Sequence, residues 1–358
     1  MKKIFVLFTL ILFLGGCSDY KEVNEMAIIS GIGLDYNENG FAVTLEVLNE
    51  KVDKKDGKIS TYTRTAQDKS IAIALEKAAD LLSHRAYYSH TKLVVISESV
   101  AKNHLQEIAD FFIRSTYLRE NFNIVVSKDI SPEDVFLAKT EENPIASSSI
   151  ITLLQTNAFA SDYTIDKKFH IVLQEILDFG KDTSLSVINV VDNNFFIDGM
   201  AVFDEYKMID IFSNEDAILY NILRNEIRKP LFNLYYEGDS FAIALYDIKS
   251  KIGVTKDEIK VDAVYRAKIM NNGPNFDIKN AEVLTALDED FSKLLNEKLE
   301  AFIRKTQEAN TDFLGLAHAY YVKSRDKNDE LWQHAKISTN VKVVINKKGL
   351  VYSIYENN

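Results

Sequence analysis

The first half of the chain alternates short apolar runs with segments of helical periodicity. Residues 26–30 and 41–47 have the β-branched, alternating character of strands, with a polar turn between them. Further apolar runs at 92–97 and 123–127 predict short buried strands. Helical spacing of apolar residues predicts helices at about 68–84, 105–116, 131–139, 145–158 and 167–178. Because strands alternate with helices, we expect a mixed α/β domain over residues 17–182.

The second half is dominated by longer alternating runs. A meander of strands, a short helix and two long β-like stretches are predicted at 184–212, 214–224, 240–252 and 259–270. The longest helix covers about 280–310, and alternation at 341–345 and 351–354 predicts a terminal hairpin. We expect a middle β-rich region over 183–240, which could be a domain of its own, and a C-terminal α+β domain over 241–358. The fold class is therefore multi-domain α+β, each domain a small, largely antiparallel or mixed sheet packed with helices.

The N-terminus has the pattern of a secretion signal. Lys2 and Lys3 precede eleven apolar residues, 4–14, which would span only about 16 Å of a hydrocarbon core roughly 30 Å thick. The run ends at Leu14-Gly15-Gly16-Cys17, which resembles the lipobox of bacterial lipoproteins. We predict a signal peptide over residues 1–16 and lipidation of Cys17, where two acyl chains would give durable anchoring. The alternative is a simple secretory signal with an incidental cysteine.

Composition narrows the classes of function. Cys17 is the only cysteine, so an intrachain disulfide, a CxxC centre and a multi-cysteine zinc site are excluded. The chain carries 53 acidic and 42 basic residues, a formal net charge of −11. Removing residues 1–16 leaves 40 basic residues and a charge of −13, so a nucleic-acid partner is not expected.

Motifs for catalysis are weak. Gly31 and Gly33 follow a strand like the start of a dinucleotide loop, but Tyr36 occupies the third glycine position and another strand follows. These glycines are better explained by a bulge or a close backbone approach. His84, His90 and His318 lack metal-ligand spacing, and no nucleophile elbow or Walker sequence occurs. We therefore predict neither a cofactor nor an enzyme.

Four segments, taken in order, resemble the C-subunit (GerAC-type) lipoproteins of bacterial spore germinant receptors. They are Gly16–Asp19 with Glu22–Asp35, Ser89–Glu98 with Arg114 and Arg119 after it, Ile197–Phe203, and Asp312–Gly315. The family commonly has Trp after the lipid-bearing cysteine, whereas this chain has Ser18. That difference leaves the anchor intact but removes an interfacial aromatic side chain.

The resemblance implies a lipid-anchored subunit on the outer face of the inner spore membrane, beside A-type and B-type membrane subunits that sense nutrients. Its motif positions would be structural or interface residues: Gly31, Gly33, Asp35, His90, Gly199, Phe203, Asp312 and Gly315. A substrate-binding lipoprotein of a membrane transporter is the alternative, and it would have two doubly wound lobes around a ligand cleft. A lipid-anchored hydrolase would need carboxylates or histidines gathered in one deep pocket.

Overall fold

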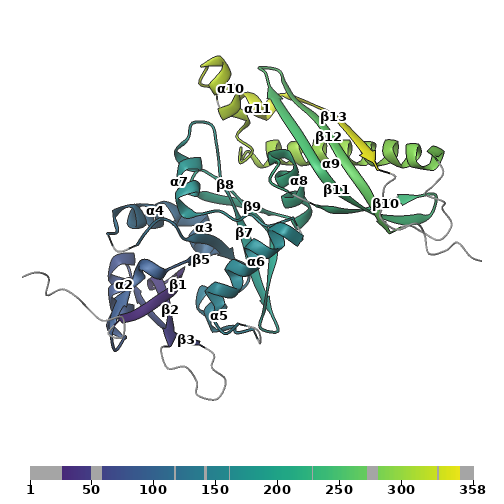
Figure 1. The fold of residues 1–358 in the computed structure, drawn as a ribbon. Coiled ribbons are helices and arrows are strands. Elements are labelled where there is room, and N and C mark those ends of the chain that lie inside the picture. The colour runs from purple at the N-terminus through teal and green to yellow at the C-terminus, as the bar shows by residue number, and fades with distance from the viewer. Residues whose placement is uncertain are drawn as a thin grey trace, which may run out of the picture.

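A computed structural model describes the fold of the chain (Figure 1). It describes residues 26–49, 59–116, 118–140, 143–160, 162–227, 229–271, 281–328 and 330–346. The signal peptide, Cys17 and the second strand of the predicted terminal hairpin lie outside these residues. Helices and strands form two α+β domains, each built around its own sheet, which confirms the predicted fold class.

The first domain is built on a nine-stranded mixed sheet. Its central strands β1, β5, β6 and β7 are parallel, and antiparallel hairpins extend it on both sides in the order β3-β2-β1-β5-β6-β7-β8-β9. The short strand β4 pairs separately with β1. The strand bounds are β1 Met26–Asn37, β2 Gly40–Asn49, β3 Ser60–Asp68, β4 Arg85–Tyr87, β5 Leu93–Ser97, β6 Asn123–Ser127, β7 Ser184–Val191, β8 Asn194–Asp204 and β9 Lys207–Phe212.

Helices cover both faces of this sheet, as the continuous apolar runs of its central strands require. Val94 and Ile96 of β5 face one helical layer, and Leu93 and Val95 face the other. The first layer contains α2 Ile71–Asp80, α3 Glu98–Asn103, α4 Leu105–Arg114 and α7 Phe169–Leu177. The second layer contains α5 Pro132–Leu137 and α6 Ala146–Ala160.

The second domain is a four-stranded sheet with one helical layer. The strand order is β10-β11-β12-β13, antiparallel except for the parallel pair β12–β13. The long helix predicted at about 280–310 is present as α9 and packs on this sheet. The element bounds are α8 Asn214–Arg224, β10 Leu231–Tyr236, β11 Asp239–Val254, β12 Glu258–Asn271, α9 Ala281–Ala309, α10 Leu316–Ser324, α11 Leu331–His334 and β13 Lys336–Ile345.

The boundary expected after residue 182 does not coincide with the division between the sheets. β7, β8 and β9 belong to the first sheet because β7 pairs with β6, Val126 facing Val187. β10 belongs to the second sheet, so the expected middle region 183–240 is divided between the two domains. β8 serves both cores: Ala201 and Phe203 face the first core, whereas Met200 and Val202 face the second.

Gly199 lies in β8, beside the end of the antiparallel strand β9. Its φ is +108°, and a Cβ atom there would lie 2.4 Å from the carbonyl oxygen of Phe212. We expect Gly199→Ala to lower the free energy of unfolding by about 2 to 4 kcal/mol, through backbone strain and overpacking together. Urea unfolding measures this effect. Gly253→Ala is the matched control, because its nearest neighbour would lie 3.8 Å away, and an equal loss in both variants would contradict the prediction.

Candidate functional site

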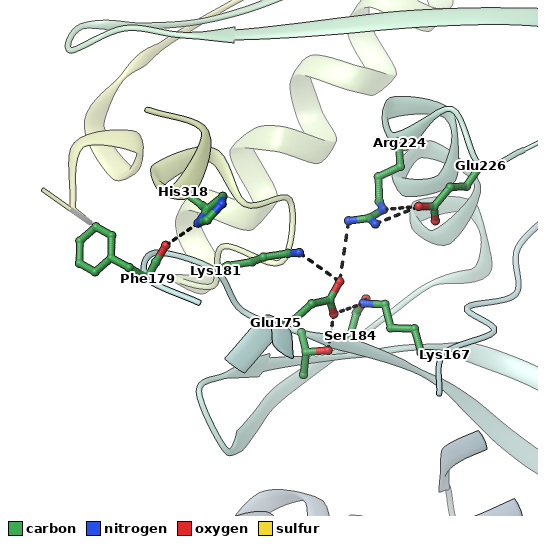
Figure 2. A network of polar contacts seen from close by, with 9 residues as sticks. Lys167, Glu175, Phe179, Lys181, Ser184, Arg224, Glu226 and His318 are labelled. Carbon is green, nitrogen blue, oxygen red and sulfur yellow. Dashed lines mark hydrogen bonds and ion pairs between the residues drawn. The ribbon is translucent and has the colours of Figure 1, made fainter. Parts of the chain in front are cut away.

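Polar residues concentrate where the two domains meet. We call this place the junction, formed by residues 179–184, which lead from α7 into β7, and residues 311–318, which lead from α9 into α10. The two segments are joined through the backbone: the Asp182 amide donates to the Asp312 carbonyl at 3.0 Å, and the His318 amide donates to the Gly180 carbonyl at 2.9 Å. His318 Nδ1 also lies 3.0 Å from the carbonyl oxygen of Phe179. Figure 2 draws this contact as a dashed line.

Asp312 caps the start of α10. Its Oδ1 accepts the Leu316 amide at 2.8 Å and its Oδ2 accepts the Ala317 amide at 2.7 Å. These amides have no partner within the helix, so a carboxylate is a favourable acceptor for them. Gly315, with φ +71°, lets the chain turn between the carboxylate and the helix. Asp312 as a residue is only 4% exposed, so its carboxyl group is almost completely removed from water.

Asp182 lies on the first-domain side of the junction, and we call Asp182 together with residues 311–317 the corner. Its Oδ2 accepts the Asp312 amide at 2.6 Å, and its Oδ1 accepts the Glu205 amide at 3.0 Å. Burial raises the pKa of Asp312 to about 8, and the nearby charge of Asp182 adds to this shift despite the hydrogen bonds. Burial likewise raises the pKa of Asp182. Burial therefore disfavours the ionised form of Asp312, whereas the two amides that its oxygens accept favour it.

The corner is fixed to the shared strand β8 as well. The Thr311 hydroxyl donates to the carbonyl of Phe203, and the Phe203 amide donates to the Thr183 carbonyl at 3.1 Å. Next to it, the Phe313 ring lies 5.7 Å from that of Phe212 on β9, with the planes at 88°. Hydrogen bonds and aromatic packing thus hold the second domain against the end of the first sheet.

A buried carboxylate with three cations lies beside this corner (Figure 2). Glu175 of α7 accepts from Lys167 Nζ at 2.5 Å and from the Thr183 hydroxyl at 2.7 Å. Its other oxygen lies 3.5 Å from Lys181 Nζ and 3.9 Å from Arg224 of α8. We call these four charged residues the Glu175 cluster.

The Glu175 cluster has three cations and one carboxylate, a net charge of +2, which Glu226 beside Arg224 reduces to +1. Burial alone would raise the pKa of Glu175, but Lys167 and Lys181 outweigh it, and the pKa lies below its usual range. Lys167 also donates to the Ser184 hydroxyl at 3.2 Å, and Arg224 pairs with Glu226. Because the charged groups are engaged with one another, the cluster has the character of a structural ion-pair network.

The structure brings together only some of the predicted positions. Phe203, Asp312 and Gly315 meet at the junction, and Gly199 lies further along β8, where its amide donates to Asn214 of α8. His90 is exposed in a short 3-10 helix, Tyr88–His90.

The remaining predicted positions lie on β1. Gly31 and Gly33 allow a close approach of α5, since Cβ atoms there would lie 2.6 Å from the Phe136 ring and 2.8 Å from Pro132. A side chain at either position would collide with α5, so close packing accounts for both glycines. Asp35, near the end of β1, is half-buried and accepts the amide of Tyr36 at 2.8 Å.

Sequence reasoning missed Glu46, Glu175 and Asp182. Glu46 of β2 accepts the Ala146 amide at the start of α6 and the Ser30 hydroxyl, both at 2.7 Å, and burial raises its pKa. Glu46 and Glu175 each interrupt an apolar run, FAVTLEVL and FHIVLQEIL, and that interruption was the available signal. Asp182 carries no comparable signal, because its partner Asp312 is 130 residues away.

Within the described part of the chain, no metal-binding site is assembled. No group of three or more His, Cys, Asp or Glu side chains is placed to hold a metal ion there. A groove of about 710 Å³ lies between α6 and the β7–β8 turn, lined mainly by polar residues such as Asn143, Thr152 and Asn193. It lies within the first domain, away from the junction. None of the described helices combines the length and apolarity needed to cross a bilayer.

Fold and site together define a two-domain α+β protein whose buried polar residues join its domains. Two family models match the chain in order: "Spore germination protein N-terminal domain" over residues 19–190, and "Spore germination B3/ GerAC like, C-terminal" over residues 198–349. The chain belongs to the GerAC-like family of spore germination proteins, the family indicated by its sequence motifs.

Two relatives are distant in sequence but match nearly the whole chain. Spore germination protein KC of Bacillus subtilis (strain 168) is 24% identical, over 91% of this chain and 87% of its own. Spore germination protein GerQC of Bacillus cereus is 19% identical, over 96% and 98%. The crystal structure of the GerBC protein matches with a TM-score of 0.60 at 14% identity, covering 91% of this chain and 99% of that one. The structural match to GerBC shows that the two chains share a fold.

Protonation of Asp312 should make stability depend on pH. Its pKa rises from 3.8 to about 8 on folding, so this contribution is fully present below pH about 4 and is lost as the pH rises through 8. We expect Asp312→Asn to lower the free energy of unfolding at pH 6 by about 1 to 3 kcal/mol, because an amide NH₂ would face one of the two helix amides. The gap from the wild type should shrink towards pH 9. Urea unfolding between pH 5 and 9 measures this difference in unfolding free energy. The exposed substitution Asp326→Asn is the control. If Asp312→Asn and the wild type lost stability with pH in parallel, Asp312 would not be the titrating group.

Removing the charge of Glu175 should be costly. Glu175→Gln leaves Lys167, whose side chain is 8% exposed, without its main counterion, and we expect a loss of about 3 to 5 kcal/mol in unfolding free energy. Glu98→Gln is the matched control, since its partner Lys102 is 49% exposed and the pair contributes at most about 1 kcal/mol. Chemical denaturation measures the unfolding free energy of both variants. A similar loss in Glu175→Gln and Glu98→Gln would contradict a special role for the Glu175 cluster.

Proposed function

We propose that this chain is a non-enzymatic lipoprotein subunit of a nutrient germinant receptor complex, needed for nutrient-triggered spore germination. The observation that carries the proposal is the ordered match of both GerAC-like family models across residues 19–349. The polar groups at the junction fit this role, since they hold two domains in a fixed relation and are engaged with one another. Such a body can transmit or stabilise contacts without chemistry of its own.

Anchoring is assigned to Cys17. The sequence Leu14-Gly15-Gly16-Cys17 directly after the apolar run supports cleavage before the cysteine and its acylation. Two acyl chains on one residue exceed the marginal binding that one chain provides. The proposed location is the outer face of the inner spore membrane, where the chain would contact A-type and B-type membrane subunits.

A substrate-binding lipoprotein of a transporter receives less support. That class was expected to have two doubly wound lobes around a ligand cleft. The second domain instead has a mainly antiparallel sheet covered by helices on one face, and the groove described above lies inside the first domain. These features favour the receptor subunit.

The anchor can be tested by one substitution. Cys17→Ala removes the thiol that would carry the lipid, so we expect the chain to move from the membrane fraction to the soluble fraction and nutrient-triggered germination to fall. Immunoblotting of fractionated spores measures the distribution, with Ser18→Ala as a neighbouring control that leaves the thiol in place. Full membrane retention of Cys17→Ala would refute lipid anchoring through this residue.

A further inference from the structure

The sheet of the second domain has an uncovered face. Along β12 the side chains of Ile259, Val261, Ala263, Tyr265 and Ala267 point into the core under α9. The alternating positions, with their neighbours on β11 and β13, form the opposite surface, which we call the outer face. It comprises the alternate positions 247–251 of β11, 258–268 of β12 and 336–344 of β13.

The centre of the outer face is open among the described residues. Val264 lies on an inner strand of the sheet, between Lys249 of β11 and Lys342 of β13, yet it is 53% exposed. A central strand normally has both faces covered when both are apolar, whereas this one is apolar on one face and polar on the other. The outer face is therefore available to a partner.

Its charge is opposite to that of the whole chain. The outer face contains seven basic and three acidic side chains, a net of +4, on a chain whose formal net charge is −11. The acidic residues are Asp247, Glu258 and Asp262.

Part of this charge is balanced within the face. Lys249 and Arg266 approach Asp247 at 3.5 and 3.7 Å, and Lys260 lies 3.0 Å from Asp262. The remaining basic residues have no ion pair within 4 Å among the described residues: Lys251, Lys268, Lys336 and Lys342. The first two come from adjacent strands and the last two from the edge strand, so basic side chains without an ion pair extend across the sheet.

We propose that the outer face is a docking surface for an acidic surface of a protein partner. Charge complementarity names the chemistry of this partner, and the exposed Val264 supplies an apolar contact at the centre. The proposal deepens and rests on the proposed function, in which the partner is one of the membrane subunits of the receptor.

A protein fits this surface better than a lipid headgroup layer does. Asp247 and Asp262 lie among the basic residues, and such fixed carboxylates oppose anionic headgroups but can pair with basic residues of a protein. In Figure 1, moreover, the second sheet and β1, where the described chain starts, lie at opposite ends of the molecule. The C-terminal residues 347–358 are an unsuitable occupant by charge, since they contain two lysines and one glutamate.

The test uses full-length tagged chains in spores. The fourfold variant K251E/K268E/K336E/K342E should remain in the membrane fraction but recover about tenfold less of the A-type and B-type subunits on affinity purification from detergent extracts. The matched control, K69E/K92E/K207E/K323E, changes the net charge equally at exposed positions away from the outer face and should recover both subunits like the wild type. Thermal unfolding midpoints of the purified chains establish that both variants fold.

Each other outcome overturns the inference in a recognisable way. Undiminished recovery of subunits by the fourfold variant refutes the docking surface and leaves the proposed function standing. Failure of the wild type to recover either subunit refutes the proposed function itself. Loss of binding to phosphatidylglycerol vesicles without loss of subunits assigns the face to lipid. A change of oligomeric state in gel filtration assigns it to a second copy of the chain.

Discussion

The relation between the two domains depends on satisfying backbone amides at one buried corner. The first turn of α10 begins where the two domains meet, and its Leu316 and Ala317 amides would be without partners if Asp312 did not accept from them. The Asp312 amide is in turn bound by Asp182 of the first domain. A shift of either domain would break the hydrogen bonds between Asp182 and Asp312 and leave their buried groups unpaired, at a cost of about 1 to 3 kcal/mol for each. The corner therefore has one favourable arrangement.

The Glu175 cluster adds a second, different constraint at the same place. Replacing a buried ion pair with apolar residues is often neutral or stabilising, so the cluster is poorly explained as a source of stability. Its members come from α7, α8 and the segments before and after α7, and Glu175 satisfies them only when all of these are in place. We interpret the cluster as a device for specificity: it disfavours other packings of the domains by leaving charges unpaired.

Local features of this fold could be predicted from the sequence, and long-range ones could not. The helix near 280–310 followed from its apolar stripe, and β1, β5 and β6 followed from short apolar runs. β3, Ser60–Asp68, was missed because its sequence STYTRTAQD is mostly polar and its strand character depends on pairing with β2. The place of β7 in the first sheet depends on its pairing with β6, which lies about 60 residues earlier in the chain. Likewise Asp312 was recognisable as a motif position, but its partner Asp182 was not, since no local pattern encodes a contact across 130 residues.

Charge shows why an average over the chain is a poor guide to its surfaces. A net charge of −11 indicates a body repelled by anionic surfaces, and taken alone it leaves the proposed acyl anchor as the sole attachment to a membrane. The register of β11, β12 and β13 nevertheless gathers basic side chains on one uncovered face while apolar ones enter the core. The period of two that builds the hydrophobic core thus also sorts charge, and it gives one side of an acidic protein the opposite sign. The proposed acylation of Cys17 and the proposed docking through the basic face would together hold the chain at two separate points, which fixes the orientation of a rigid body where a single tether cannot.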